Sequence, residues 1–162
     1  MYHNFFTLSK HVGALCTAQN VRIALAESCT GGLLASCLTD VAGCSDWFAG
    51  SAVVYSNHAK THLLGVDEKP IADHGAVSIE VASAMAEGAL HRFHTDYALA
   101  ITGIAGPSGG SEKKPVGTVC FALADLKGIE TEVKYFTSGR GNVRQQAVLF
   151  ALEWLIIHLT VE

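Results

Sequence analysis

Charged side chains are scarce in this chain of 162 residues, where Asp, Glu, Lys and Arg together make up 16% of the composition. The net charge is −4, and the sequence contains no run of Lys or Arg. Proteins dedicated to nucleic-acid binding normally present a basic face. We therefore expect no nucleic-acid partner.

Long apolar segments and paired cysteines are also lacking. No apolar stretch approaches the roughly 20 residues that a membrane-spanning helix needs. The N-terminus has no basic start followed by an apolar core, so it does not look like a signal peptide. The five cysteines are odd in number and include no C-x-x-C pair, which argues against a secreted disulfide framework. These features favour a cytoplasmic protein with no membrane partner.

Apolar residues, by contrast, are abundant at 49%. A chain of this length is typical of one domain, so we interpret residues 1–162 as a single unit. It is large enough to bury roughly 70% of its unfolded surface without staples. Much of the apolar surplus is alanine, which suits close helix packing or a subunit interface, and we expect a homo-oligomer.

Apolar patterns of helical and strand type alternate along the chain and end in a hairpin. The helices are expected over residues 5–19, 30–43, 57–66, 78–93 and 142–159, and the strands over 21–26, 48–56, 96–103, 116–124 and 129–137. Asn57 and Gly65 are expected to cap the short third helix. This order predicts an α/β fold, a three-layer α/β/α sandwich around a mixed, mostly parallel sheet of about five strands.

The stretch ESCTGG follows the first predicted strand. A helix that starts there directs free N–H groups and a partial positive charge toward whatever lies above it. An exposed Ser28 beside such donors has the parts for acyl transfer, a nucleophile and an oxyanion hole. Serine is also a preferred N-cap, so Ser28 as a plain helix cap is the alternative.

Cys29 is a rival nucleophile, because a helix N-terminus lowers the pKa of a thiol. No histidine partner lies near it in sequence. A buried structural cysteine is the commoner outcome, and we favour it.

A serine nucleophile needs a base, and the second strand runs into VVYSNHAK. If this strand neighbours the first, Tyr55 and Lys60 lie at the same edge of the sheet as Ser28. Ser–Lys pairs are a known variant of the catalytic triad, provided that the lysine is partly desolvated. The alternative for Lys60 is a solvated helix lysine.

Two further segments suit an anionic ligand. The glycine-rich ITGIAGPSGG follows the third long strand and fits a phosphate or ribose, although it matches neither a Walker loop nor a dinucleotide fingerprint. Arg140 and Arg144 precede the last helix and could bind phosphate, sit on the surface or pair with a carboxylate.

His58 and His62 have i, i+4 spacing but no third metal ligand nearby, so we expect two surface histidines.

In combination, these segments resemble the C-terminal domain family of the competence/damage-inducible protein CinA, over about residues 6–159. The resemblance lies in AESCTGG, YSNHAKTHLLGV, HGAVS, AITGIAGPSGG with KPVGTV, and GRGNVRQQA, in that order. It implies an α/β/α domain of the standalone type. It also implies an amidohydrolase that converts nicotinamide mononucleotide (NMN) to nicotinate mononucleotide and ammonia, with no metal or organic cofactor.

The resemblance also assigns roles to residues. It implies that Ser28 is the nucleophile, Lys60 the base and Tyr55 a helper, which agrees with the roles argued from the segments themselves. Backbone N–H groups around Thr30, Gly31 and Gly32 are expected to form the oxyanion hole. Substrate contacts are implied at Gly43, Asn57, Thr102, Gly103, Ala105 and Arg140.

Overall fold

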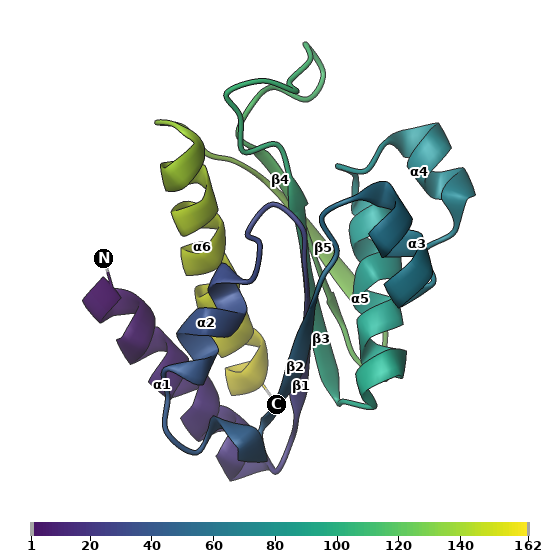
Figure 1. The fold of residues 1–162 in the computed structure, drawn as a ribbon. Coiled ribbons are helices and arrows are strands. Elements are labelled where there is room, and N and C mark those ends of the chain that lie inside the picture. Colours follow the sequence, from purple (N-terminus) through teal and green to yellow (C-terminus); the bar gives the residue numbers. More distant parts are fainter. Residues whose placement is uncertain (1, 162) are drawn as a thin grey trace.

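The computed structural model describes residues 2–161, and its elements alternate as expected (Figure 1). The helices are α1 (Tyr2–Gln19), α2 (Leu33–Thr39), α3 (Asn57–Leu64), α4 (Glu68–His74), α5 (Ile79–Phe93) and α6 (Arg140–Val161), with a short 3-10 turn η1 (Cys44–Asp46). The strands are β1 (Ile23–Glu27), β2 (Phe48–Val53), β3 (Tyr97–Gly103), β4 (Thr118–Ala124) and β5 (Ile129–Tyr135).

The five strands form one sheet in the order β2-β1-β3-β4-β5. Strand β1 pairs in parallel with β2 and with β3, whereas β4 is antiparallel to both β3 and β5. Four strands therefore share one direction and β4 opposes them. The mixed, mostly parallel sheet that the sequence predicts is confirmed.

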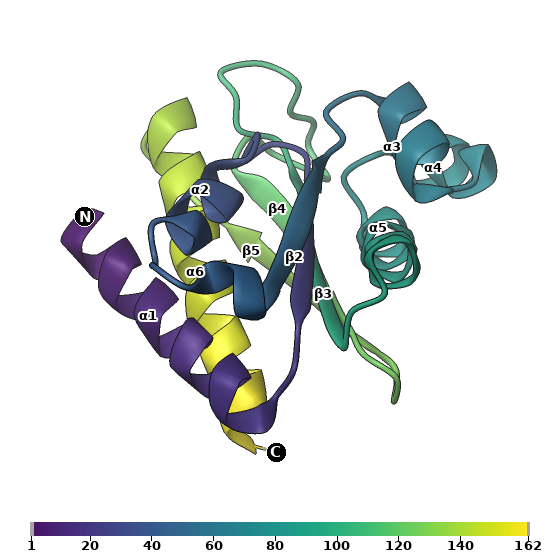
Figure 2. The ribbon, with the colours of Figure 1, turned by 60° about the horizontal axis from the view of Figure 1, so that its bottom comes forward.

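Helices cover both faces of the sheet, with α1, α2 and α6 on one side and α3, α4 and α5 on the other (Figure 2). The strand sequences explain the two layers, because side chains alternate between faces. Leu25, Leu99 and Phe121 pack against α1, α2 and α6, whereas the face toward α5 is built largely from alanines, such as Ala26 and Ala100. Small residues on that face allow α5 to lie close to the strands.

Several element boundaries differ from the sequence-based expectation. Helix α2 begins only at Leu33, because Gly31 and Gly32 have positive φ and form a turn instead of helix. The N-cap of α3 is Ser56, whose hydroxyl accepts a hydrogen bond from the Ala59 N–H, so the prediction of Asn57 as the cap is wrong. Gly65 is confirmed as the C-cap.

Helix α4 was not predicted, and its sequence, EKPIADH, contains a proline. Pro70 is the third residue of the helix, where the backbone N–H has no partner within the helix and its loss costs nothing. The capped helix predicted over residues 78–93 is confirmed as α5, with the Ser78 hydroxyl accepting from the Val81 N–H.

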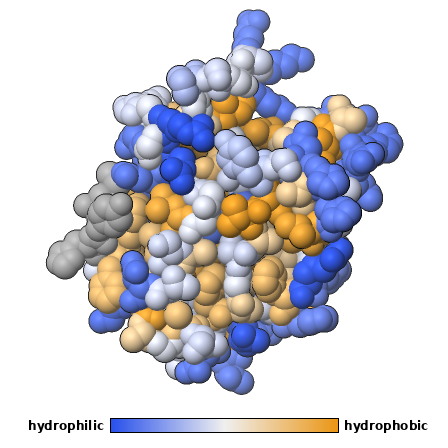
Figure 3. Space-filling model, in the orientation of Figure 1, coloured by the Kyte–Doolittle hydropathy of each residue, from blue (hydrophilic) through white to orange (hydrophobic). Residues whose placement is uncertain are grey.

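Parallel strands β1, β2 and β3 end at the same edge of the sheet, and the loop 104–117 between β3 and β4 rises beside them (Figure 1). Open α/β sheets place ligands at this edge. The outer strand β2 carries no charged residue, and apolar residues gather around the middle of the face that it shares with α2 and α3 (Figure 3). No helix among residues 2–161 is long and apolar enough to cross a membrane.

Candidate active site

Ser28 lies immediately beyond the end of β1, and its N–H donates to the Ile101 carbonyl at 2.9 Å. The side chain is only 6% exposed, yet it lines a pocket of about 220 Å³. The pocket is lined by Ser28, Cys29, Tyr55, Asn57, Lys60, Ala76, Val77, Gly103, Ala105 and Arg140. Seven other residues singled out from the sequence therefore lie around the same pocket as Ser28. They are Cys29, Tyr55, Asn57, Lys60, Gly103, Ala105 and Arg140.

Lys60 contacts Ser28 directly, with 3.1 Å between Lys60 Nζ and Ser28 Oγ. The lysine is 1% exposed, so the alternative of a solvated helix lysine is wrong. Burial lowers the pKa of its amine from the ordinary value, and no carboxylate among the described residues forms an ion pair with it. Such an environment favours the neutral amine, the form that can accept a proton.

The other contacts of Lys60 suit the neutral amine. Nζ lies 3.1 Å from the Val54 carbonyl oxygen and 3.3 Å from that of Tyr55. Carbonyl oxygens can only accept, so a neutral amine can give them its two N–H donors and turn its lone pair toward Ser28. The end of β2 therefore aims Lys60 at the nucleophile, and the Ser56 cap fixes the helix turn that carries it.

Glu27 fixes the turn that follows Ser28. Its side chain is fully buried, and its two oxygens accept five hydrogen bonds. The donors are Thr30 Oγ1, the N–H groups of Gly32, Leu34 and Ala35, and Ser51 Oγ. Glu27, and not Ser28, therefore satisfies the N-terminal N–H groups of α2, and Ser28 remains free for Lys60. A charged residue at the end of the apolar run VRIALA was the sequence signal for this role.

The donors of the expected oxyanion hole need a correction. The Gly31 N–H donates to the Ser28 carbonyl and the Gly32 N–H to Glu27, so neither is available to a ligand. No oxygen of the described residues accepts from the N–H groups of Cys29 or Thr30. Of the three predicted residues, only Thr30 has an N–H without an oxygen partner among the described residues, and its side chain is buried and does not line the pocket. Cys29, which does line the pocket, is added to it.

Cys29 is a poor rival to Ser28. It is 5% exposed, and burial raises the pKa of its thiol to about 12. A thiol with so high a pKa carries almost no thiolate at neutral pH, and the thiolate is the nucleophilic form. The structure thus favours the buried structural role.

Tyr55 and Arg140 form one wall of the pocket. The Tyr55 ring is 61% exposed, and its hydroxyl accepts a hydrogen bond from Arg140 Nη2 at 3.2 Å. Arg140 Nη1 donates to the Gly106 carbonyl at 2.8 Å, which ties the start of α6 to the glycine-rich loop. The contact of Tyr55 with Lys60 runs through its backbone carbonyl, and no hydrogen bond joins its hydroxyl to the dyad.

Two predicted substrate contacts lie outside the pocket. Thr102 is buried on the α5 side of the sheet, where its hydroxyl donates to the Ala76 carbonyl, so it supports the pocket wall instead of facing a ligand. Gly43 precedes η1 and β2, at the end of the sheet opposite Ser28. By contrast, Asn57, Gly103 and Ala105 do line the pocket.

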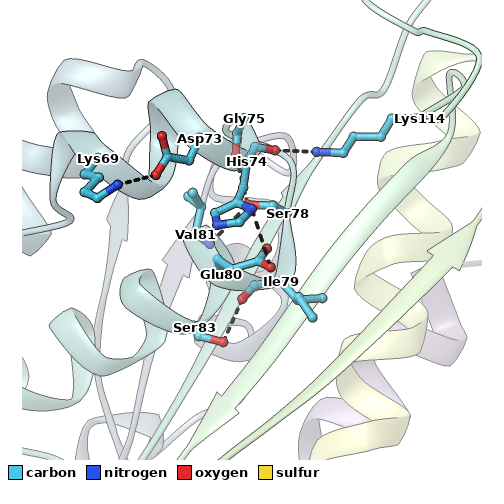
Figure 4. Close-up of polar contacts among 10 residues, drawn as sticks. All are labelled: Lys69, Asp73, His74, Gly75, Ser78, Ile79, Glu80, Val81, Ser83 and Lys114. Atoms are coloured by element: carbon cyan, nitrogen blue, oxygen red, sulfur yellow. Dashed lines mark hydrogen bonds and ion pairs between the residues drawn. The ribbon is translucent and has the colours of Figure 1, made fainter.

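The wall formed by Ala76 and Val77 was missed from the sequence. It is held by the corner between α4 and α5, where Ser78 Oγ donates to the Gly75 carbonyl at 2.9 Å (Figure 4). Lys114 Nζ donates to the His74 carbonyl at 2.5 Å and so anchors the loop 104–117 to the same corner. The segment HGAVS contributes to the family resemblance, but its place beside Ser28 depends on long-range contacts such as that of Thr102 with Ala76.

Two other features carry less chemistry. A larger groove of about 520 Å³ lies between the β4–β5 turn and the end of α6, and its lining includes the ion pair of His158 with Glu130 at 2.9 Å. No pair of a nucleophile and a base lines it. His58 and His62 stack at 4.9 Å, and no group of three potential metal ligands occurs within residues 2–161.

Comparison with known proteins places this site in a family. The model of the CinA C-terminal domain matches residues 6–159. The chain belongs to the CinA C-terminal domain family. The family resemblance inferred from the sequence motifs is thereby confirmed.

Relatives and solved structures of the family cover nearly the whole chain. "Nicotinamide-nucleotide amidohydrolase PncC" of Escherichia coli K12 is 50% identical over 149 residues, which is 91% of this chain and 90% of that protein. A "CinA-like protein" of Geobacter sulfurreducens is also 50% identical, but the match spans only 36% of it. The crystal structure of the competence/damage-inducible protein CihA from Agrobacterium tumefaciens superposes with a TM-score of 0.92 at 40% identity, covering 97% of this chain and 96% of that one.

Proposed function

We propose that this chain is an amidohydrolase that converts NMN to nicotinate mononucleotide and ammonia through an acyl-enzyme on Ser28. The observation that carries the proposal is the buried contact between Lys60 Nζ and Ser28 Oγ in a pocket that Cys29 also lines. The printed name of the Escherichia coli relative, a nicotinamide-nucleotide amidohydrolase, supports the choice of substrate.

In the first half-reaction, neutral Lys60 takes the hydroxyl proton of Ser28 while Ser28 Oγ attacks the carboxamide carbon. The negative charge that develops on the carbonyl oxygen is stabilised by the N–H groups of Cys29 and Thr30. The C–N bond then breaks, and protonated Lys60 gives its proton to the departing ammonia. The product of this half-reaction is an ester between Ser28 and the nicotinate carbonyl.

In the second half-reaction, a water molecule attacks the ester. Lys60 takes a proton from the water, and the same two N–H groups stabilise the second tetrahedral intermediate. The C–O bond to Ser28 breaks, and Lys60 returns the proton to Ser28 Oγ. Nicotinate mononucleotide leaves, and the dyad is restored.

The substrate phosphate is assigned to Arg140. Its guanidinium already spans Tyr55 and Gly106, so its position is fixed before a ligand binds. A bound phosphate held there would orient the nicotinamide ring toward Ser28. Ala105 and Asn57 line the same pocket and complete the substrate contacts in this assignment.

The proposal is tested by measuring ammonia release from NMN with the purified protein in the presence of EDTA. We expect release by the wild type and none by Ser28→Ala. Release of ammonia from another small amide but not from NMN would change the substrate and keep the mechanism. Binding of NMN without release would instead point to a catalytically silent nucleotide-binding member of the family.

Replacing Arg140 with methionine is expected to raise the KM for NMN by about 10-fold or more, because a hydrogen bond to a charged group contributes about 1.5–3 kcal/mol. The matched substrate is nicotinamide riboside, which lacks the phosphate, and its kcat/KM should change little. An equal loss for both substrates would show that Arg140 holds the pocket wall and does not bind phosphate.

A further inference from the structure

Arg144 binds the backbone of the nucleophile turn. From the first turns of α6, its Nε donates to the Cys29 carbonyl at 3.1 Å and its Nη2 to the Thr30 carbonyl at 3.0 Å. The side chain forms no ion pair with any described carboxylate. One edge of the guanidinium is thus committed to two neutral carbonyl groups, and the structural pair with Asp or Glu that the sequence left open is not formed.

These two contacts determine where the N–H groups of the turn point. In a planar trans peptide the carbonyl and the following N–H point in opposite directions. Because the Cys29 carbonyl faces Arg144, the Thr30 N–H points away from Arg144. That N–H is one of the two that no described oxygen accepts.

Glu27 and Arg144 hold the turn through opposite kinds of backbone group, because Glu27 accepts from N–H groups and Arg144 donates to carbonyl oxygens. Glu27 accepts from the N–H groups of Gly32, Leu34 and Ala35, which lie beyond the oxyanion donors, whereas Arg144 donates to the carbonyls beside those donors. Glu27 also accepts from the Thr30 hydroxyl, and the Leu33 N–H also donates to the Thr30 carbonyl. Among the described side chains, only Arg144 donates to the Cys29 carbonyl, which belongs to the Cys29–Thr30 peptide. A cation at the carbonyl end of a peptide also polarises its N–H and makes it a stronger donor.

We propose that Arg144 is a positioning residue for acyl transfer, which holds the Cys29–Thr30 peptide so that its N–H stabilises the oxyanion formed at Ser28. This inference rests on the proposed function. Arg144 touches neither substrate nor Ser28 Oγ in this role and acts through the peptide. Loss of one oxyanion donor in other acyl-transfer enzymes costs about 100- to 1000-fold in kcat.

The test uses two variants, Arg144→Met and Arg144→Lys, with Arg92→Met as the matched control. Arg92 is exposed near the end of α5, so its replacement removes an arginine far from the turn. For NMN we expect Arg144→Met to lower kcat by about 100-fold with the KM within a factor of about 3, because substrate binding does not use the oxyanion hole. Arg144→Lys keeps the positive charge but offers one donor nitrogen in place of two, so its kcat should lie between those of the wild type and Arg144→Met.

A second readout does not depend on the substrate assignment. An alkyl fluorophosphonate reacts with an activated serine when Ser28 Oγ bonds to phosphorus, fluoride leaves, and Lys60 takes the serine proton. The phosphoryl oxygen occupies the oxyanion hole during this step, so we expect the labelling rate, followed by mass spectrometry, to fall about 100-fold in Arg144→Met and to stay unchanged in Arg92→Met. If the wild type releases no ammonia from NMN, the proposed substrate fails, and the labelling rates still test Arg144.

Thermal unfolding of each variant shows whether it is folded under the assay conditions. If Arg144→Met does not fold, Arg144→Lys decides, and we expect its labelling rate to fall about 10-fold as an intermediate loss. Wild-type kcat and labelling rate in a folded Arg144 variant would overturn the proposal. A rise in KM at unchanged kcat would also overturn it, because that pattern belongs to a residue that binds substrate.

Discussion

Replacing Lys60 with methionine is expected to lower the rate of ammonia release from NMN by about 1000-fold or more, because it removes the general base from a unit in which nucleophile and base act together. Methionine fills a similar volume, so the buried site between α3 and β2 remains packed. The rate is measured by a coupled ammonia assay at substrate concentrations well above and well below the KM. Lys69→Met is the matched control, because Lys69 is an exposed lysine on α4.

The pH dependence of the wild type carries a further expectation. Lys60 acts as a base only when it is neutral, and burial lowers the pKa of its amine from 10.5. The rate should therefore rise with pH through this lowered pKa and reach its plateau before the pH at which an ordinary lysine loses its proton.

A Lys60→Met protein that keeps more than about a tenth of the wild-type rate would contradict a role as general base.

Replacing Glu27 with glutamine is expected to destabilise the fold by about 2–4 kcal/mol, since each buried donor left without an acceptor costs about 1–3 kcal/mol. The carboxylate accepts hydrogen bonds at both oxygens, three at Oε2 and two at Oε1. An amide has only one oxygen, so its NH₂ group must face donors such as the Ala35 N–H. Urea unfolding measures the change.

Ser51→Ala is the matched control for Glu27, because it removes one of the five donors and leaves the carboxylate with four. We expect a loss of about 1 kcal/mol or less for this change. We also expect Glu27→Gln to reduce ammonia release, because the turn that carries Ser28 loses part of its support. A free energy of unfolding equal to that of the wild type would show that the carboxylate does not hold the turn.

The layers of the fold could be predicted because their signals are local. The continuous apolar runs IALA and YALAI mark buried strands, and the capped apolar pattern after Ser78 marks α5. Helix α4 was not predicted, and its Pro70 is a residue that breaks a helix interior but is tolerated in a first turn. The start of α2 shifted because Gly31 and Gly32 take up left-handed turn conformations, which a helical pattern does not reveal.

The pairing of Ser28 with Lys60 was within reach of the sequence, because both follow predicted strands and lie at one edge of the sheet if those strands are neighbours. The support of that pair was not. Glu27 holds the turn mainly through contacts that lie three to eight positions along the chain. Arg144 and the Ala76–Val77 wall, by contrast, depend on contacts between residues far apart in the sequence, such as the 115 positions between Arg144 and Cys29. Spacing along the chain carries no signal for such contacts, whereas the fold brings them together at one edge of the sheet.

The most direct test of the account is to trap the covalent intermediate. The protein is mixed with NMN, quenched in acid within the first turnover and digested, and the peptide that contains Ser28 is analysed by mass spectrometry. We expect the mass of a nicotinate mononucleotide acyl group on Ser28 in the wild type and no added mass in Ser28→Ala. Rapid ammonia release with no acyl group on any residue, or with the acyl group on Cys29, would contradict the Ser28–Lys60 mechanism.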